Sequence, residues 1–386
     1  MIVDPAWLAR WLVSHHGLAQ PHGVGAEGAR TLLARLRCIQ IDPLDVIGTN
    51  ADLVALARVD GLARGEVYDA VLPGHGFEHF FKERCLLPAA QFPAYRDRAR
   101  AVGWWRTSER MKRIDEAAID DVVAEVRDRG PLFANELADR GRVDPIDWSG
   151  WKGTAKASTL ALEVAWVRCR VVVSGRNPAG NRRYDLPERA LGAVATGPSP
   201  ADPEGAALVE RVEAMGLLPR SVGPWWGQLE DVRVSLADRL VAEGRLEQVQ
   251  LPGTRRVWLA PAGFRDRPIE PPDDRMRILG PLDPLLWDRD LVRRVFGFDY
   301  VWEVYKPAAT RKWGWYVVPL LHQGALVGRV EARLVDGELR VDRQWTEDGA
   351  RWDAAAYRAC LERHAEALTA TRGGGTTRAS RPPSPP

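Results

Sequence analysis

The sequence predicts an α+β fold that is mainly helical and divided into several domains, the last of which is β-rich. The chain has 386 residues, enough for two to four domains at roughly 100 to 200 residues each. Hydrophobic residues make up 45% and charged residues 27%, a globular composition that excludes wholesale disorder. Proline-rich stretches at 197–203 and 261–274 have the composition of linkers and divide the chain.

The first part of the chain, 1–115, is expected to open with two helices. Apolar residues at helical spacing predict them at 5–14 and 27–36. A short strand is expected at 38–42, where isoleucines alternate with polar residues.

The second part, 116–197, has a fuller set of elements. The pattern predicts a helix through 119–126, a short helix at 132–139, a helix at 154–166 and hairpin strands at 170–174 and 183–186. Three helices followed by a hairpin is the order of a winged helix.

The third part, 203–262, repeats this order. It predicts a helix at 204–215, a short segment at 229–233, a helix at 235–243 and strands at 246–250 and 255–259. We therefore predict tandem winged helices, with 1–115 as a looser version of the same unit.

The last folded part, 275–368, changes character. Runs at 313–321 and 325–334, separated by a Gln-Gly turn, predict a β-hairpin within a β-rich domain. The tail, 371–386, has almost no apolar residues to bury and is predicted to be disordered.

Local charge favours nucleic acid, although the net charge is only +2. Residues 151–183 hold seven cations and one acid, namely Lys152, Lys156, Arg168, Arg170, Arg176, Arg182 and Arg183 against Glu163. Such an excess suits phosphate, although a solvated basic face is an alternative. A second basic stretch at 96–113 favours the nucleic-acid interpretation.

The segment 305–316 places Lys306, Arg311 and Lys312 among tyrosines and tryptophans, with no acid. Basic residues interleaved with aromatic ones suit phosphate contact and base stacking. The alternative is that these rings pack on the edge of a sheet.

The sequence Ile39-Gln40-Ile41-Asp42-Pro43 is the sharpest candidate for chemistry. On an extended strand Gln40 and Asp42 share one face, and the isoleucines face the core. A carboxylate beside an amide could activate and orient a water molecule. The alternative is a polar strand face on which Asp42 caps the turn at Pro43.

Other chemistries lack support. His75 and His79 have a metal-chelating spacing, but no third ligand is evident and an ordinary histidine pair is the simpler interpretation. Four scattered cysteines suit a reducing cytoplasm. The chain has no phosphate-binding loop, nucleophile elbow, signal peptide or apolar run of membrane-spanning length, so we expect a cytoplasmic protein.

Four separated motifs resemble the YcaQ-like family of bacterial winged-helix DNA glycosylases. They are RCIQIDPLDVI at 37–47, FEHFFKERCLLP at 77–88, LGPLDPLLWDR at 279–289 and FGFDYVWEVYKPAATRKWGWYVVPLL at 296–321. The resemblance spans about residues 5–365 and implies tandem winged helices followed by a β-rich domain. The family motif of Gln, an aliphatic residue, then Gln or Asp reads Gln40-Ile41-Asp42 here, which is the Gln/Asp branch.

The resemblance implies hydrolysis of the N-glycosidic bond of N-alkylated purines in duplex DNA, with unhooking of interstrand crosslinks in some members. Asp42 would activate water and stabilise the sugar cation, and Gln40 would position water or substrate. Neither is an amine, so a monofunctional enzyme is expected, without metal or cofactor, acting as a nucleoid-associated monomer. The chain departs from the family at His79 to Lys82 and at Glu331 and Arg333, which puts lesion preference in doubt.

A noncatalytic winged-helix regulator is the competing hypothesis, because a fold does not determine function. The absence of an evident dimerisation helix and the presence of the Gln-Ile-Asp segment speak against it. A homodimer on one palindromic site would favour the regulator.

Overall fold

The computed structural model describes residues 1–101, 109–144 and 154–370. Helix accounts for 41% and strand for 20% of the structure, so the expectation of a mainly helical α+β protein is confirmed. The described strands form five small sheets, all of them antiparallel. The tail that was predicted to be disordered, 371–386, lies outside the described residues.

The first part of the chain folds around a three-stranded sheet of order β1-β3-β2. Its elements are α1 (Pro5–His15), α2 (Gly25–Leu36), β1 (Ile39–Gln40), α3 (Asn50–Leu56), α4 (Glu66–Val71), β2 (Gly76–Phe80), β3 (Arg84–Pro88) and α5 (Phe92–Ala101). The Asp4 carboxylate caps α1 by accepting the Trp7 N–H over 2.8 Å. Thr49 and Asp52 form a capping box at the start of α3.

The second part contains a sheet of order β4-β8-β7 and a separate two-stranded sheet. Its elements are α7 (Glu116–Arg129), β4 (Leu132–Phe133), β5 (Arg142–Val143), β6 (Ala155–Lys156), α8 (Ala157–Val167), β7 (Val172–Arg176), β8 (Arg182–Asp185) and α9 (Pro187–Leu191). The short helix predicted at 132–139 is wrong. Leu132 and Phe133 instead pair with β8, and the Ala138 N–H donates to the Glu125 carboxylate over 3.0 Å.

The third part follows its predicted elements closely. It comprises α10 (Pro203–Met215), β9 (Leu218–Pro219), α11 (Arg233–Ala242), β10 (Leu246–Gln250) and β11 (Val257–Pro261), with strand order β9-β11-β10. All three parts therefore share one connectivity: the first strand pairs with the third, and the third pairs with the second. In each case a helix precedes the first strand and at least one helix separates it from the second.

The last part forms a four-stranded sheet of order β12-β13-β14-β15. It comprises β12 (Arg277–Ile278), α12 (Arg289–Phe296), β13 (Val317–His322), β14 (Ala325–Val335), β15 (Glu338–Thr346) and α13 (Ala354–Thr369). The predicted hairpin corresponds to β13 and β14, which pair in antiparallel fashion around Gln323 and Gly324. Short 3-10 helices occur at Ala89–Gln91, Gly192–Thr196, Gly227–Leu229, Phe264–Asp266, Pro284–Leu286 and Ala308–Thr310.

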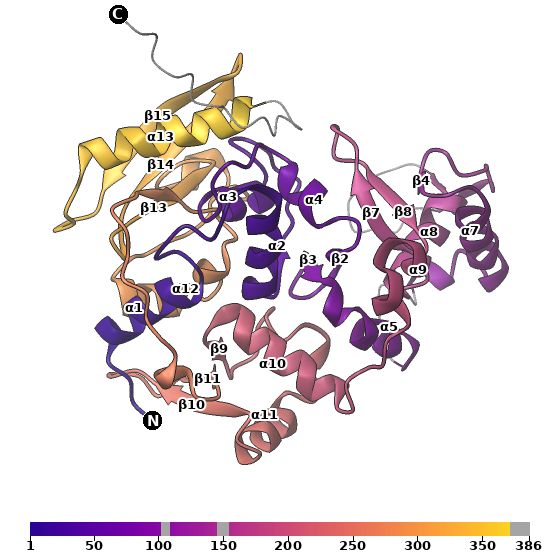
Figure 1. The fold of residues 1–386 in the computed structure, drawn as a ribbon, viewed down its shortest axis with the longest axis horizontal. Coiled ribbons are helices and arrows are strands. Elements are labelled where there is room, and N and C mark those ends of the chain that lie inside the picture. Colours follow the sequence, from indigo (N-terminus) through magenta and orange to yellow (C-terminus); the bar gives the residue numbers. More distant parts are fainter. Residues whose placement is uncertain (102–108, 145–153, 371–386) are drawn as a thin grey trace, which may run out of the picture.

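The four parts are not independent globules, because they share cores. In Figure 1, α2, α3 and α4 lie centrally, with the C-terminal sheet and α13 on one side and the β7–β8 hairpin on the other. Leu33 of α2 and Val54 of α3 belong to one apolar cluster with Val122 of α7 and Leu160 of α8. By contrast, Leu12 of α1 packs in a cluster with residues of α12 and β11.

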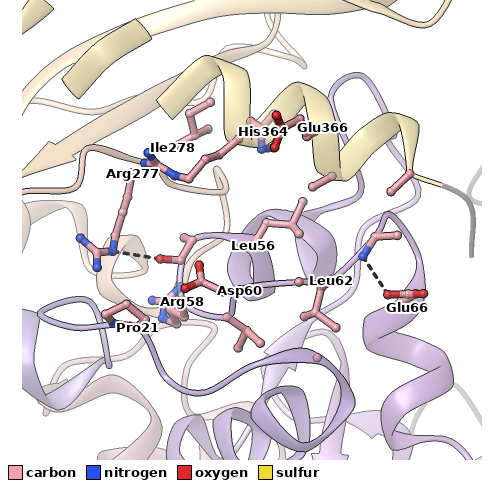
Figure 2. A pocket seen from close by; sticks show the side chains of 18 of the residues that line it. Pro21, Leu56, Arg58, Asp60, Leu62, Glu66, Arg277, Ile278, His364 and Glu366 are labelled. Carbon is pink, nitrogen blue, oxygen red and sulfur yellow. Dashed lines mark hydrogen bonds between the residues drawn. The ribbon is translucent and has the colours of Figure 1, made fainter. Parts of the chain in front are cut away.

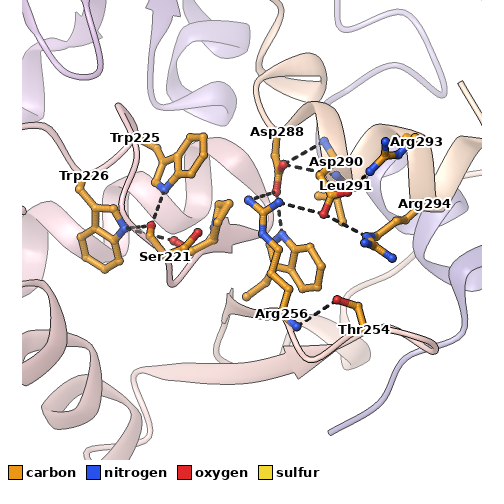
Figure 3. Close-up of polar contacts among 12 residues, drawn as sticks. Ser221, Trp225, Trp226, Thr254, Arg256, Asp288, Asp290, Leu291, Arg293 and Arg294 are labelled. Atoms are coloured by element: carbon orange, nitrogen blue, oxygen red, sulfur yellow. Dashed lines mark hydrogen bonds and ion pairs between the residues drawn. The ribbon is translucent and has the colours of Figure 1, made fainter. Parts of the chain in front are cut away.

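An ionic network joins the third sheet to α12 (Figure 3). Arg256, beside β11, lies 3.3 Å from the Asp288 carboxylate and 2.9 Å from that of Asp290. The buried Trp258 Nε1 donates to Asp288 over 2.7 Å. Asp288 also caps α12 by accepting the N–H groups of Asp290 and Leu291. This network holds the segment before α12 in place, and that segment reaches the candidate site.

Candidate active site

The Gln-Ile-Asp segment lies where β1 ends. Gln40 pairs with Cys85 of β3, and the Ile41 N–H donates to the Arg84 carbonyl oxygen over 2.8 Å. The strand was predicted to continue to Asp42, and this is wrong, because β1 stops at Gln40. The motif residues nevertheless stay together, since both Gln40 and Asp42 line one cavity.

Asp42 begins a turn rather than continuing the strand. Its Oδ1 accepts the Leu44 N–H over 2.9 Å, across Pro43, which has no N–H to add to a ladder. The turn-capping role considered for Asp42 is therefore present. The hydrogen bond from Leu44 uses Oδ1 of Asp42, and no described residue donates to Oδ2. Burial raises the pKa of Asp42 above its usual value, against the effect of the Leu44 N–H.

Gln40 is held by its backbone and leaves its side chain available. Its carbonyl oxygen accepts Asn50 Nδ2 over 2.8 Å, and Asn50 Oδ1 accepts the Leu282 N–H over 3.0 Å. The residue is only 5% exposed, and its buried Oε1 has no hydrogen-bond partner within the described structure. A buried amide oxygen without a hydrogen bond lowers the stability of the fold unless a ligand or a water molecule donates to it.

The cavity around these residues has a volume of about 1120 Å³. Its lining comes from every sheet-bearing part except the third, and it includes Tyr68, Phe80, Arg84, the β7–β8 turn at 177–180, Leu282, Trp302 and Tyr305. Tyr305 is 81% exposed and meets Trp302 edge to face, with ring centroids 5.7 Å apart.

The arrangement can support proton transfer next to a bound planar aromatic group. A carboxylate with a raised pKa and a free oxygen can accept a proton from water. The neighbouring amide oxygen can orient that water, and the aromatic rings at the mouth of the cavity offer stacking surfaces.

The structure separates the predicted phosphate-binding residues into two groups. Four already have carboxylate partners: Arg168 with Glu116, Arg170 with Asp120, Arg176 with Glu78 and Lys306 with Glu303. Within the described residues, five have none: Lys156, Arg182, Arg183, Arg311 and Lys312. Lys152 lies outside the described residues.

Two further cavities lack the Gln-Ile-Asp residues. One, of about 820 Å³, is lined by Arg96, Arg98, Arg168 and Arg170. The other, of about 710 Å³, lies between α13 and the loop after α3 (Figure 2). In this second cavity, Arg277 Nε donates to the Ala57 carbonyl oxygen over 3.0 Å.

The histidine pair is separated by the structure. His79 lies on β2, where its Nε2 is 3.0 Å from the Val167 carbonyl oxygen and burial lowers its pKa to about 4. His75 precedes that strand. Across 1–101, 109–144 and 154–370, no cluster of three potential ligands could hold a metal ion. None of the helices in those ranges is long and apolar enough to cross a bilayer.

Sequence reasoning missed Asn50, Phe80, Arg84 and Trp302 as parts of this site. Phe80, Arg84 and Trp302 line the cavity, and Asn50 donates to the Gln40 carbonyl oxygen. Only the tertiary fold brings these residues together. Three of them fall within the motifs at 77–88 and 296–321 that carry the family resemblance, which is the signal that could have identified them.

Comparison with known proteins finds one family model and one similar fold. The model of the family described as DNA glycosylase AlkZ-like matches residues 33–370. Among solved structures, a DNA glycosylase AlkZ from Streptomyces sahachiroi is similar, with a TM-score of 0.58 and 18% sequence identity. The match covers 96% of this chain and 97% of that one, so the likeness of fold is not confined to one part of either chain.

Proposed function

Since the chain belongs to the AlkZ-like DNA glycosylase family, we propose that it hydrolyses the N-glycosidic bond of N-alkylated purines in duplex DNA, with Asp42 and Gln40 at the reacting sugar. One observation carries this proposal: the free carboxylate oxygen of Asp42 and the unpartnered Oε1 of Gln40 line the same cavity. The same chemistry would extend to unhooking alkylated interstrand crosslinks.

The reaction needs little acid catalysis. An N-alkylated purine carries positive charge and takes the electron pair of the broken C1′–N bond. The sugar develops oxocarbenium character. Asp42 stabilises this cation and accepts the proton of the water whose oxygen bonds to C1′. The raised pKa of Asp42 makes it a better base.

We propose a monofunctional enzyme, which releases the base without cutting the strand. Strand cleavage by a glycosylase proceeds through an amine nucleophile that forms a Schiff base with the sugar. No lysine is among the described residues that line the cavity.

Tyr305 is the proposed stacking partner of the damaged base. Its ring is exposed at the cavity and braced by Trp302. Stacking on an aromatic ring is tolerant of base identity, as a site for varied adducts requires.

For DNA binding we propose three winged helices within 1–115, 116–197 and 203–262, with the β-rich domain at 275–368. The shared strand connectivity of the first three sheets supports this division. The cations without carboxylate partners, Lys156, Arg182, Arg183, Arg311 and Lys312, are the proposed phosphate contacts.

The deciding experiment measures single-turnover release of N7-methylguanine from duplex DNA. Asp42→Asn keeps the shape and the bond from Leu44 but removes the charge, so the rate should fall by about 10²- to 10⁴-fold. Asp45→Asn is the matched control, because Asp45 lines the same cavity but is paired with Arg64. It should retain the native rate within a few fold.

Binding of an undamaged duplex should be unchanged in Asp42→Asn, which separates chemistry from folding. Equal rates for Asp42→Asn and the native protein would remove Asp42 from the mechanism. If neither N7-methylguanine nor a nitrogen-mustard crosslink reacts despite salt-sensitive duplex binding, the noncatalytic regulator is the better interpretation.

A further inference from the structure

Two arginines share one tryptophan beside the candidate active site. Arg84 of β3 and Arg182 of β8 have their guanidinium carbons 5.2 and 5.3 Å from the centroid of the Trp166 ring. Trp166 is 2% exposed, and its Nε1 donates to the Glu78 carbonyl oxygen over 2.9 Å. The ring is therefore a fixed platform that holds both cations by cation–π contact.

Within the described part of the chain, the two guanidinium groups have no counter-charge of their own. Among the described residues neither forms an ion pair, and Arg84 Nε and Arg182 Nη1 are buried without a hydrogen-bond partner. The nearby carboxylates are occupied, since Glu78 binds Arg176 over 2.7 Å and Glu163 binds Arg110 over 2.6 Å.

This arrangement is unfavourable in the free protein. Burial and the neighbouring charge of Arg182 lower the pKa of Arg84. A partly buried cation without an acceptor loses hydration, and the cation–π contact with Trp166 supplies no hydrogen-bond acceptor to replace it. Both residues are half-buried, so an anion could accept hydrogen bonds from their other guanidinium nitrogens and compensate both charges. Guanidinium forks match phosphate oxygens well.

The position of the pair indicates which phosphate would fit. Arg84 lines the same cavity as Gln40 and Asp42, and its carbonyl oxygen accepts the Ile41 N–H. An anion bound at Arg84 is thus placed by the same short β-ladder that places the catalytic motif.

We propose that Arg84 and Arg182, held on Trp166, bind the phosphodiester backbone of the damaged strand next to the lesion and position its sugar for attack. The proposal rests on the proposed function in taking DNA as the anion. It adds Arg84, which sequence analysis did not single out, and gives Arg182 a specific task.

The first test measures how DNA affinity depends on salt. Each phosphate contact contributes about 0.9 to the slope of log K against log salt. Arg84→Met and Arg182→Met should each lower that slope by up to about 1 and weaken binding by about 10-fold or more. Arg340→Met is the control, since Arg340 is an exposed residue of β15, and it should leave the slope unchanged.

The second test neutralises the DNA instead of the protein. Single methylphosphonate linkages are placed at each position around an N7-methylguanine. In the native protein, one or two positions should weaken binding and slow base release. In Arg84→Met the same positions should have no further effect, because their partner is already gone. Additive effects at every position would overturn the proposal.

The outcomes distinguish the two proposals. Base release without any coupling between Arg84 and a linkage would leave the glycosylase function in place and reject the phosphate site. If Arg84 and a linkage are coupled in binding but no base is released, the phosphate site is supported and the glycosylase function is rejected. If Arg84→Met fails to fold, Arg84→Lys keeps the charge but not the planar fork, and it should show partial coupling at the same linkages.

Discussion

Breaking the ion pair between Arg58 and Asp283 should lower the free energy of unfolding by more than the loss of an exposed ion pair does. It should also slow base release. Both side chains are 0% exposed, and two bonds of 2.7 and 2.9 Å join them. Arg58 also donates to the carbonyl oxygens of His16 and Val54. Asp283→Ala would leave this guanidinium buried without an anion, which costs about 3 to 5 kcal/mol.

The consequence for activity follows from the neighbouring residue. The Leu282 N–H donates to Asn50 Oδ1, and Asn50 Nδ2 donates to the carbonyl oxygen of Gln40. Loosening the loop at Asp283 should therefore lower the rate of N7-methylguanine release in the fraction that stays folded.

Urea titration followed by tryptophan fluorescence measures the loss of stability. Asp45→Ala is the control, because its pair with Arg64 is about one-third exposed and should contribute at most about 1 kcal/mol. The double variant Arg58→Met, Asp283→Ala leaves no unpaired buried charge. It should therefore regain a large part of the unfolding free energy that Asp283→Ala loses. A cost for Asp283→Ala no greater than that for Asp45→Ala would refute the reasoning.

Three more results are expected. Because the pKa of Asp42 is raised, its carboxylate is lost as pH falls through that raised value; the acid limb of the pH–rate profile should therefore disappear in Asp42→Asn. Tyr305→Ala should weaken binding of damaged duplex by roughly 5- to 150-fold, from about 1 to 3 kcal/mol of stacking, whereas Tyr305→Phe should bind like the native protein in a titration. Burial opposes the charge of Glu303, but hydrogen bonds from Lys306 and from backbone N–H groups including that of Trp313 outweigh it and lower its pKa to about 2. Its stabilising effect is therefore present above its ordinary pKa of 4.5 and lost as pH falls toward 2, so thermal denaturation of Glu303→Gln should show a flatter pH dependence in that range than the native protein.

The parts of the fold that follow from local signals could be predicted from sequence. The helix α10 was expected from residue 204 and begins at Pro203, where Asp202 caps it. The strand β10 matches its predicted bounds of 246–250. The predicted helix at 132–139 failed because β8, some 50 residues away, takes Leu132 and Phe133 as a strand. No local pattern reveals such a partner.

In the candidate site, too, the local features could be predicted from sequence and the features that depend on distant segments could not. The position of Gln40 and Asp42 in one cavity could be predicted from a five-residue segment, although the reason given, a shared strand face, was wrong beyond Gln40. Arg84 was missed because its significance lies in a ring and a second arginine on distant strands. Charge clustering in the sequence could not tell paired cations from unpaired ones, which is why Arg176 was grouped with Arg182.

The packing of α1 has a consequence for how the chain is made. Its residues Leu8, Trp11 and Leu12 are buried against a cluster that includes Leu217 and Phe298. A ribosome adds about 5 to 20 residues per second, so α1 emerges roughly 10 to 60 s before its distant partners Leu217 and Phe298. During that interval its apolar stripe is open to water and to other nascent chains. The apolar face of α1 is thus fully buried only after these distant segments have been made, and chaperone capture at this stage would protect the newborn protein from aggregation.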